Sequence, residues 1–211
     1  MLNNIEDLKN AFYINLIHRE DRKEKVIKQF EKLNIPINRF NAIQNNNGAI
    51  GCYLSHIKCL MLAKENNWDN VLIVEDDIYF LNIEEFKKNL NNFLETQTHF
   101  DVLLISGNNF KPYIQINENS IKISNCQTTT GYIVKNHYYD TLINHLKIGL
   151  GHLIKYPILH RFYAIDIWWK FLQKKDSWFL LIPILVVQEE GYSDIEKKNT
   201  NYFSSMIHYN K

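Results

Sequence analysis

The sequence predicts an α/β fold in which a mainly parallel central sheet is flanked by helices. Apolar segments of strand character alternate with segments of helical periodicity along most of the chain. The run Val71–Val74 is apolar and is followed at once by Glu75, Asp76 and Asp77, as expected where a buried strand leaves a sheet. The 211 residues contain no repeat and no low-complexity linker, so we expect a single domain over residues 1–211.

The first half of the chain gives strand and helix signals in alternation. Val26, Phe30 and Leu33, for example, recur at helical spacing. In order, the expected elements are a strand at 11–16, a charged turn at 17–22, a helix ended by Asn34 and Pro36, a strand at 37–43, a polar loop at 44–48, a helix after Gly51, the central strand from Val71 and a helix at 84–94.

The second half continues the pattern. The expected elements are a strand at 101–106, a short antiparallel strand at 121–123, a strand at 128–134, helices at 138–146 and 164–173, and a last strand at 178–187. Pro183 lies inside that last run and lacks an N–H for the sheet ladder, which favours an edge position for the strand.

Composition excludes several classes of protein. The formal net charge of +1 gives no electrostatic case for nucleic acid as a partner. The polar N-terminus lacks the apolar core of a signal peptide, and no apolar run reaches membrane-spanning length. The three cysteines form no metal-ligand or redox spacing, which favours a cytoplasmic or other intracellular reducing compartment. The oligomeric state cannot be read from the sequence.

The three acids after the central strand are the main candidate site. If the run stays extended, Glu75 and Asp77 share one face and Asp76 takes the other. Two converging carboxylates form a hard-oxygen site, which suits Mg²⁺ or Mn²⁺ carrying a phosphate. The alternative is that Asp76 or Asp77 only caps a following helix or turn.

Two further segments carry groups suited to an anion. His18, Arg19 and Arg22 follow the first strand, and arginine forks match phosphate oxygens, although a solvated helix turn is an equal alternative. Gly48 and Gly51 permit close backbone approach before a helix that carries Ser55 and His56. A lone histidine on such a helix is more often structural than catalytic. The chain has no phosphate-loop, dinucleotide, nucleophile-elbow or zinc-type motif.

Two late segments each have a structural and a functional interpretation. Asp166 is either a cap or first-turn residue of an aromatic-rich helix, or a general base beside Trp168 and Trp169. Gln188 and the run 191–194 form a polar cluster after the last strand, which is either a ligand loop or an ordinary one.

Taken together, these segments resemble glycosyltransferase family 25, which includes bacterial lipopolysaccharide β-glycosyltransferases and collagen β-galactosyltransferases. The resemblance covers nearly the whole chain. The matching segments are 13–16 with Arg19 and Arg22, the stretch 48–56, the acid run 74–77, residues 130–132 and residues 193–195. Members often have an arginine at the position of His18 and an acidic residue at that of Ala49.

The resemblance implies a GT-A-like fold, a nucleotide-diphosphate sugar donor such as a UDP-sugar, a divalent cation (Mn²⁺ or Mg²⁺) and inversion at the anomeric carbon. The transferred sugar is expected to be galactose or glucose, and the acceptor a hydroxyl of a glycan or a collagen-like protein. The expected metal ligands are Glu75, Asp77 and Gln188, and the expected base is Asp166. The expected donor-binding residues are Asn15, Leu16, Arg19, Arg22, Gly51, Ser55, His56, Asp76, Thr130 and Gly131.

The chemistry of the residues agrees with this resemblance, because a single displacement needs a metal site and a separate base but no covalent nucleophile. Two alternatives stay open. One is a metal-dependent nucleotidyltransferase that uses the same acids. The other is a catalytically silent sugar- or nucleotide-binding domain.

Overall fold

A computed structural model of the protein describes residues 2–97 and 99–211. Within these residues the main sheet has eight strands in the spatial order β2-β1-β3-β10-β5-β11-β8-β7. Strands β8 and β10 run antiparallel to their neighbours, and the other strands of the sheet share one direction. The predicted α/β class with a mainly parallel central sheet is therefore confirmed.

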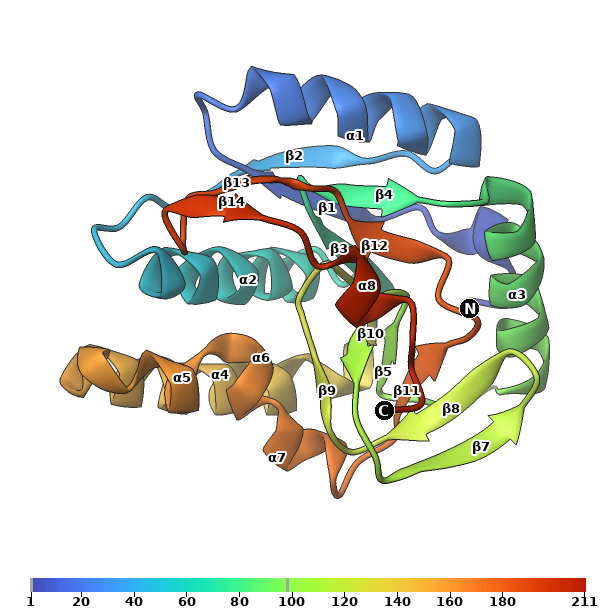
Figure 1. Cartoon of the computed structure of the whole chain (residues 1–211). Coiled ribbons are helices and arrows are strands. Elements are labelled where there is room, and N and C mark those ends of the chain that lie inside the picture. Colours follow the sequence, from blue (N-terminus) through green and yellow to red (C-terminus); the bar gives the residue numbers. More distant parts are fainter. Residues whose placement is uncertain (1, 98) are drawn as a thin grey trace.

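Figure 1 shows this sheet between two groups of helices, with three small two-stranded sheets beside it. The strands are β1 (Ala11–Asn15), β2 (Asn38–Asn41), β3 (Asn70–Glu75), β4 (Ile78–Phe80), β5 (Val102–Leu104), β6 (Asn108–Asn109), β7 (Tyr113–Asn117), β8 (Ser120–Ile123), β9 (Cys126–Gln127), β10 (Gly131–Lys135), β11 (Trp178–Leu181), β12 (Val186–Gln188), β13 (Gly191–Ser193) and β14 (Lys198–Thr200).

The helices differ widely in length. The longer ones are α1 (Glu20–Leu33), α2 (Gly48–Glu65), α3 (Ile83–Thr96) and α4 (Tyr139–Lys155). The short ones are η1 (Ile5–Asp7), η2 (Asn136–Tyr138), η3 (Pro157–Leu159), α5 (His160–Tyr163), α6 (Ile165–Trp168), α7 (Lys170–Gln173) and α8 (Phe203–Met206). Among the described residues, no helix combines the length and apolar character needed to span a membrane.

The hydrophobic core lies on both faces of the main sheet. Alternate residues of β1 and β3 pack on opposite faces of the sheet. Phe12 and Ile73 pack with α2 and α4, whereas Tyr13 and Leu72 pack with α1 and α3. This period of two follows from the pleat of a strand, and it explains why strands covered on both faces read as continuous apolar runs.

Two segments predicted as single elements are divided in the structure. The run 178–187 is not one edge strand: β11 lies inside the sheet between β5 and β8, and β12 pairs with β4 instead. Pro183 lies in the connection between them, where no ladder hydrogen bond is needed. The helix predicted at 164–173 is divided at Trp169 into α6 and α7.

The helix expected after Gly51 begins earlier, at Gly48, because the Asn47 side chain accepts a hydrogen bond from the Ala49 N–H. The strand predicted at 128–134 begins only at Gly131, and the helix predicted to end at residue 146 continues to Lys155. Strand β7 was not predicted; it lies at the edge of the main sheet and is largely exposed, although Ile114 and Ile116 give it some apolar character.

Candidate active site

A cavity of about 510 Å³ lies at the end of the sheet where β1 and β3 finish. These strands are parallel neighbours, and Ile14 pairs with Glu75, so the residues that follow both strands reach the same edge. The lining residues include Leu16, His18, Arg22, Gly51, Cys52, Ser55, His56, Glu75, Asp76, Asp77, Gln188, Ser193 and Asp194. This is the position where open α/β sheets usually bind ligands.

Glu75, the last residue of β3, is surrounded by hydrogen-bond donors. Its Oε1 accepts a 2.7 Å hydrogen bond from the Thr129 hydroxyl and lies 3.5 Å from His56 Nε2. Its Oε2 accepts a hydrogen bond from the Gln188 amide at 3.3 Å. Burial raises the pKa of Glu75, but the interactions with His56, Thr129 and Arg22 outweigh burial and bring the pKa below its usual value. Glu75 is therefore held as a carboxylate.

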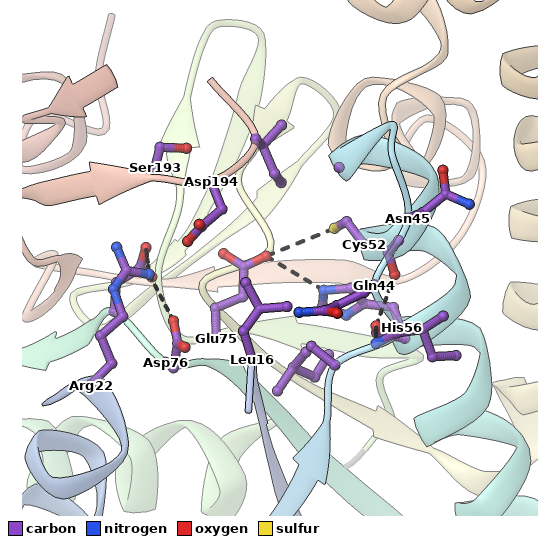
Figure 2. A pocket seen from close by; sticks show the side chains of 18 of the residues that line it. Leu16, Arg22, Gln44, Asn45, Cys52, His56, Glu75, Asp76, Ser193 and Asp194 are labelled. Carbon is purple, nitrogen blue, oxygen red and sulfur yellow. Dashed lines mark hydrogen bonds and ion pairs between the residues drawn. The ribbon is translucent and has the colours of Figure 1, made fainter. Parts of the chain in front are cut away.

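Asp76 is turned toward Arg22 and Asn15, as Figure 2 shows for Arg22. Arg22 Nη1 donates to Asp76 Oδ1 at 2.7 Å, and Asn15 Nδ2 donates to Asp76 Oδ2 at 2.7 Å. Asp76 thus fixes the position of Arg22 at the cavity wall. Asn15 is fully buried, and its Nδ2 also donates to the Arg19 carbonyl at 3.0 Å.

Asp77 has the least satisfied carboxylate of the three. Its Oδ2 lies 3.3 Å from Arg22 Nη1, whereas its Oδ1 is buried without a hydrogen-bond partner among the described residues. Burial and the neighbouring charge of Glu75 raise the pKa of Asp77 to about 7. An oxygen without a donor, beside Glu75 and next to an Arg22 guanidinium that Asp77 shares with Asp76, is suited to a cation.

The strand alternation expected for the acids does not occur. Strand β3 ends at Glu75, and Asp76 and Asp77 form a turn before β4. Glu75 and Asp77 still reach the same cavity, because the turn, rather than the pleat of a continued strand, sets their direction. Asp76 and Asp77 do not cap a helix there, because a turn and the strand β4 follow.

The first turns of α2 form the opposite wall. Gly51 is required by close packing, since a Cβ there would lie 2.5 Å from the Ile43 carbonyl oxygen. The Ser55 hydroxyl donates to the Gly51 carbonyl at 2.8 Å and accepts from the Ile43 N–H at 2.9 Å. These two residues therefore hold the loop before α2 in place.

His56 is 1% exposed and is fixed from both ring nitrogens. Its Nδ1 lies 2.8 Å from the Tyr132 hydroxyl, and its Nε2 faces Glu75. The ring also stacks on Tyr132. His56 is thus a buried, hydrogen-bonded residue that orients the Glu75 carboxylate.

Cys52 was not predicted as a site residue, and the cysteines were expected to form no metal-ligand spacing. The fold nevertheless gathers one ligand atom each from Cys52, His56 and Glu75 within 4.8 Å of one another. Cys52 and His56 are four residues apart on α2, a spacing that places both on one helix face. Burial and the Glu75 charge raise the pKa of the Cys52 thiol well above its usual value, so the thiol stays protonated.

The two predicted arginines have different positions. Arg22 lines the cavity, and it also donates to the Tyr192 carbonyl at 3.0 Å. Arg19 is paired with Asp21 at 3.0 Å and with Asp194 at 3.1 Å, and it lies outside the described lining residues. Arg19 therefore anchors the end of β13 and the turn after it, where Ser193 and Asp194 line the cavity (Figure 2).

Thr130, Gly131 and Asp166 also lie outside the described lining residues. Asp166 is a first-turn residue of α6, and its Oδ2 accepts a hydrogen bond from the Thr128 N–H at 3.1 Å. Thr128 has a φ of 76°, and the next residue, Thr129, donates to Glu75. Asp166 thus supports the strained loop that positions Thr129. Burial raises the pKa of Asp166.

The donor set fits a divalent cation held by oxygen atoms. Glu75 and Asp77 supply carboxylates, and the Gln188 amide lies beside Glu75 in the same cavity. Hard cations such as Mn²⁺ and Mg²⁺ prefer such oxygens, whereas a protonated thiol is a poor ligand for them.

Comparisons with known proteins show which family the chain belongs to. The model of the family described as "Glycosyltransferase family 25 (LPS biosynthesis protein)" matches residues 46–150, which include the α2 wall, the acid run and β10. The chain belongs to glycosyltransferase family 25. The sheet topology agrees with the GT-A-like fold expected for this family.

Two curated relatives of this family 25 chain are similar over different lengths. A Haemophilus influenzae protein provisionally named a glycosyltransferase is 32% identical over 90 residues, covering 32% of this chain and 32% of that protein. A Drosophila melanogaster protein named "Glycosyltransferase 25 family member" is 24% identical over 239 residues, covering 90% of this chain and 38% of that protein. The matches therefore span only about a third of either relative's length.

Among solved structures, the mannose-1-phosphate geranyltransferase of Thermus thermophilus matches with a TM-score of 0.48 and 12% identity. That match covers 82% of this chain and 73% of the other.

Proposed function

We propose that this protein is an inverting, metal-dependent glycosyltransferase. It transfers a hexose, galactose or glucose, from a UDP-sugar to a hydroxyl of a glycan or a collagen-like protein. Membership of family 25 supports the reaction class. The observation that carries the proposal is the meeting of Glu75, Asp77 and Gln188 at the edge of one cavity, with a buried Asp77 oxygen that has no partner among the described residues.

Glu75, Asp77 and Gln188 are the residues that would hold the cation. Glu75 is already ionised, and its donors Thr129 and His56 keep its carboxylate in a fixed orientation. When bound, the cation supplies positive charge that stabilises the diphosphate leaving group. Arg22, on the same wall, is the side chain suited to the phosphates, although Asp76 shares its guanidinium.

The acceptor hydroxyl has to lose its proton as it attacks, which requires a base away from the cation. Asp166 is the base that we propose. Burial raises the pKa of Asp166, as suits a proton acceptor, but the carboxylate also holds the Thr128 N–H. Asp194 is the second candidate, because it lines the cavity, where Arg19 pairs with it.

A donor screen tests the proposal. The purified protein is incubated with a panel of nucleotide sugars, with Mn²⁺ or with a chelator, and the released nucleotide is identified. We expect a nucleoside diphosphate from a UDP-sugar, released only with the cation, and an inverted anomeric configuration in the product. A second incubation, with a nucleoside triphosphate and a sugar 1-phosphate in place of the nucleotide sugar, covers the other enzyme class: release of pyrophosphate there would identify a nucleotidyltransferase instead. Binding of a donor without turnover of any donor or acceptor would identify a silent binding domain.

A further inference from the structure

The corner formed by the end of α4, η3 and α5 exposes an unusual run of apolar side chains. Residues 154–162 are all exposed, and five of these nine are large and apolar or aromatic. Their exposed fractions are 57% for Ile154, 41% for Tyr156, 89% for Ile158, 40% for Leu159 and 66% for Phe162. Scattered exposed apolar residues are ordinary, but a contiguous set of this kind marks an interaction surface.

The charged side chains of this apolar corner, residues 154–162, are all basic. Lys155 and Arg161 belong to it, and the chain has no acidic residue between Asp140 and Asp166. Neither cation is paired with a carboxylate among the salt bridges of the described residues; the Lys155 ammonium lies over the Tyr156 ring, 5.2 Å from its centroid. Both positive charges are therefore available to a negatively charged partner.

Packing holds the apolar corner in place and keeps its side chains outward. The Tyr163 ring stacks on His152 of α4, with centroids 5.2 Å apart and planes 14° apart, and Tyr163 also packs near Trp168. Leu153, just before the corner, is fully buried. The chain is therefore anchored at both ends of the corner, while the side chains between the two anchors are exposed.

The apolar corner lies at the same end of the molecule as the candidate active site. Gly149 of α4 packs against Tyr53 of α2, so the last turns of α4 lie beside the first turns of α2. Those first turns of α2 form a wall of the cavity. In Figure 1, α5 and the start of α2 both lie at the left of the view, away from the β7–β8 hairpin. A flat partner on the corner would therefore lie on the cavity side of the molecule.

We propose that the apolar corner is a peripheral docking surface for a bilayer of anionic lipids. Apolar side chains flanked by lysine and arginine, without acids, are the composition that inserts at the headgroup boundary and is attracted by negative lipid charge. A second copy of the chain fits less well, because a two-fold contact through this corner would bring Lys155 and Arg161 against the same cations of the partner. The proposal does not depend on the proposed enzymatic activity.

Vesicle cosedimentation tests the docking surface directly. The probes are phosphatidylcholine vesicles with and without phosphatidylglycerol, and no sugar donor is present. We expect the protein to sediment with the anionic vesicles and to bind the neutral ones much more weakly. Failure to bind anionic vesicles at low ionic strength would overturn the proposal.

Two variants separate the apolar from the electrostatic contribution. The double variant Ile158→Ser/Phe162→Ser and the charge reversal Lys155→Glu/Arg161→Glu should each weaken binding by about tenfold or more. Ile114→Ser is the matched control, because Ile114 is 63% exposed on β7, outside the corner. All the substituted side chains are exposed, so the melting transition should stay unchanged in each variant.

Equal vesicle binding by the parent and both corner variants would overturn the proposal. Light scattering tests the alternative that a second copy of the chain binds at the corner. A dimer that dissociates in Ile158→Ser/Phe162→Ser, together with no vesicle binding by the parent protein, would assign the corner to that second copy instead.

Discussion

Nη1 of Arg22 lies 2.7 Å from Oδ1 of Asp76, although the two residues are separated by 54 positions in the chain. The side chains are 13% and 10% exposed, so this ion pair is largely shielded from water. The contact joins the first turn of α1 to the turn after β3. It means that the arginine expected to bind phosphate also neutralises the acids of the site.

Arg22→Ala should therefore affect stability as well as donor binding. Removing one partner of a buried pair leaves an uncompensated charge and costs roughly 3–5 kcal/mol of unfolding free energy. Urea unfolding measures this loss, and adding Asp76→Asn to Arg22→Ala should recover part of it. Arg19→Ala is the control, since its partners Asp21 and Asp194 are more exposed than Asp76, at 62% and 36%, and its loss should cost at most about 1 kcal/mol. Equal effects of the two arginine variants would contradict the buried-pair account.

Asp77 should make stability depend on pH. Its pKa is about 7 in the folded protein, against a usual value of 3.8, so the folded state keeps a proton that the unfolded state loses. The unfolding free energy should therefore fall as pH rises from about 4 to 7 through this group. Asp77→Asn removes the titration and should raise the melting temperature increasingly over that range.

The control for this pH series is Asp140→Asn, which changes an exposed carboxylate paired with Lys64. Its melting temperature should follow that of the parent protein at every pH. A constant difference between Asp77→Asn and the parent across the whole range would refute the raised pKa.

Metal binding should distinguish the two possible ligand sets that share Glu75. If the cation is held by Glu75, Asp77 and Gln188, Asp77→Ala should weaken Mn²⁺ binding about ten- to hundredfold, as expected for loss of a charged ligand worth ~1.5–3 kcal/mol. Cys52→Ser should leave the affinity nearly unchanged. Calorimetric titration with Mn²⁺ measures both. The reverse pattern would move the site to Cys52, His56 and Glu75.

Asp166→Asn tests the proposed base. Asparagine keeps an oxygen that can accept the Thr128 N–H, so the loop that positions Thr129 should persist. Donor and metal binding should then be retained while the transfer rate at saturating donor falls by ~10²–10⁴. The melting transition verifies folding. A rate close to that of the parent would reject Asp166 as the base, and Asp194→Asn would be the next variant to measure.

Gly149 and Gly151 on α4 provide a matched test of packing between α2, α4 and α6. A Cβ at Gly149 would lie 2.4 Å from Trp168 and 2.5 Å from the Tyr53 hydroxyl, so Gly149→Ala should destabilise by roughly 1–3 kcal/mol. A Cβ at Gly151 meets no described atom within 4 Å, so Gly151→Ala should stabilise by about 0.5–1 kcal/mol through helix propensity. Denaturant unfolding of both variants measures the difference in their unfolding free energies. Two variants of equal stability would contradict this account of the packing.

The sequence by itself determined the class of the fold and the location of the acids. Strands buried on both faces have to be apolar, so runs such as Val71–Val74 identified the central sheet and its exit at Glu75. It also marked Gly48 and Gly51 as positions that permit close backbone approach, which the structure shows at Gly51. Resemblance to family 25 supplied the expected donor and metal.

Only the tertiary structure decided how the charged side chains are used. Sequence could not show that Arg22 pairs with Asp76, or that Cys52 and Thr129 meet Glu75, because each pair joins segments distant in the chain. The directions of Asp76 and Asp77 depended on the turn that ends β3, because both residues lie outside the pleated strand. Long-range packing sets such contacts, whereas the local pattern of apolar and polar residues sets the strands and helices that carry them.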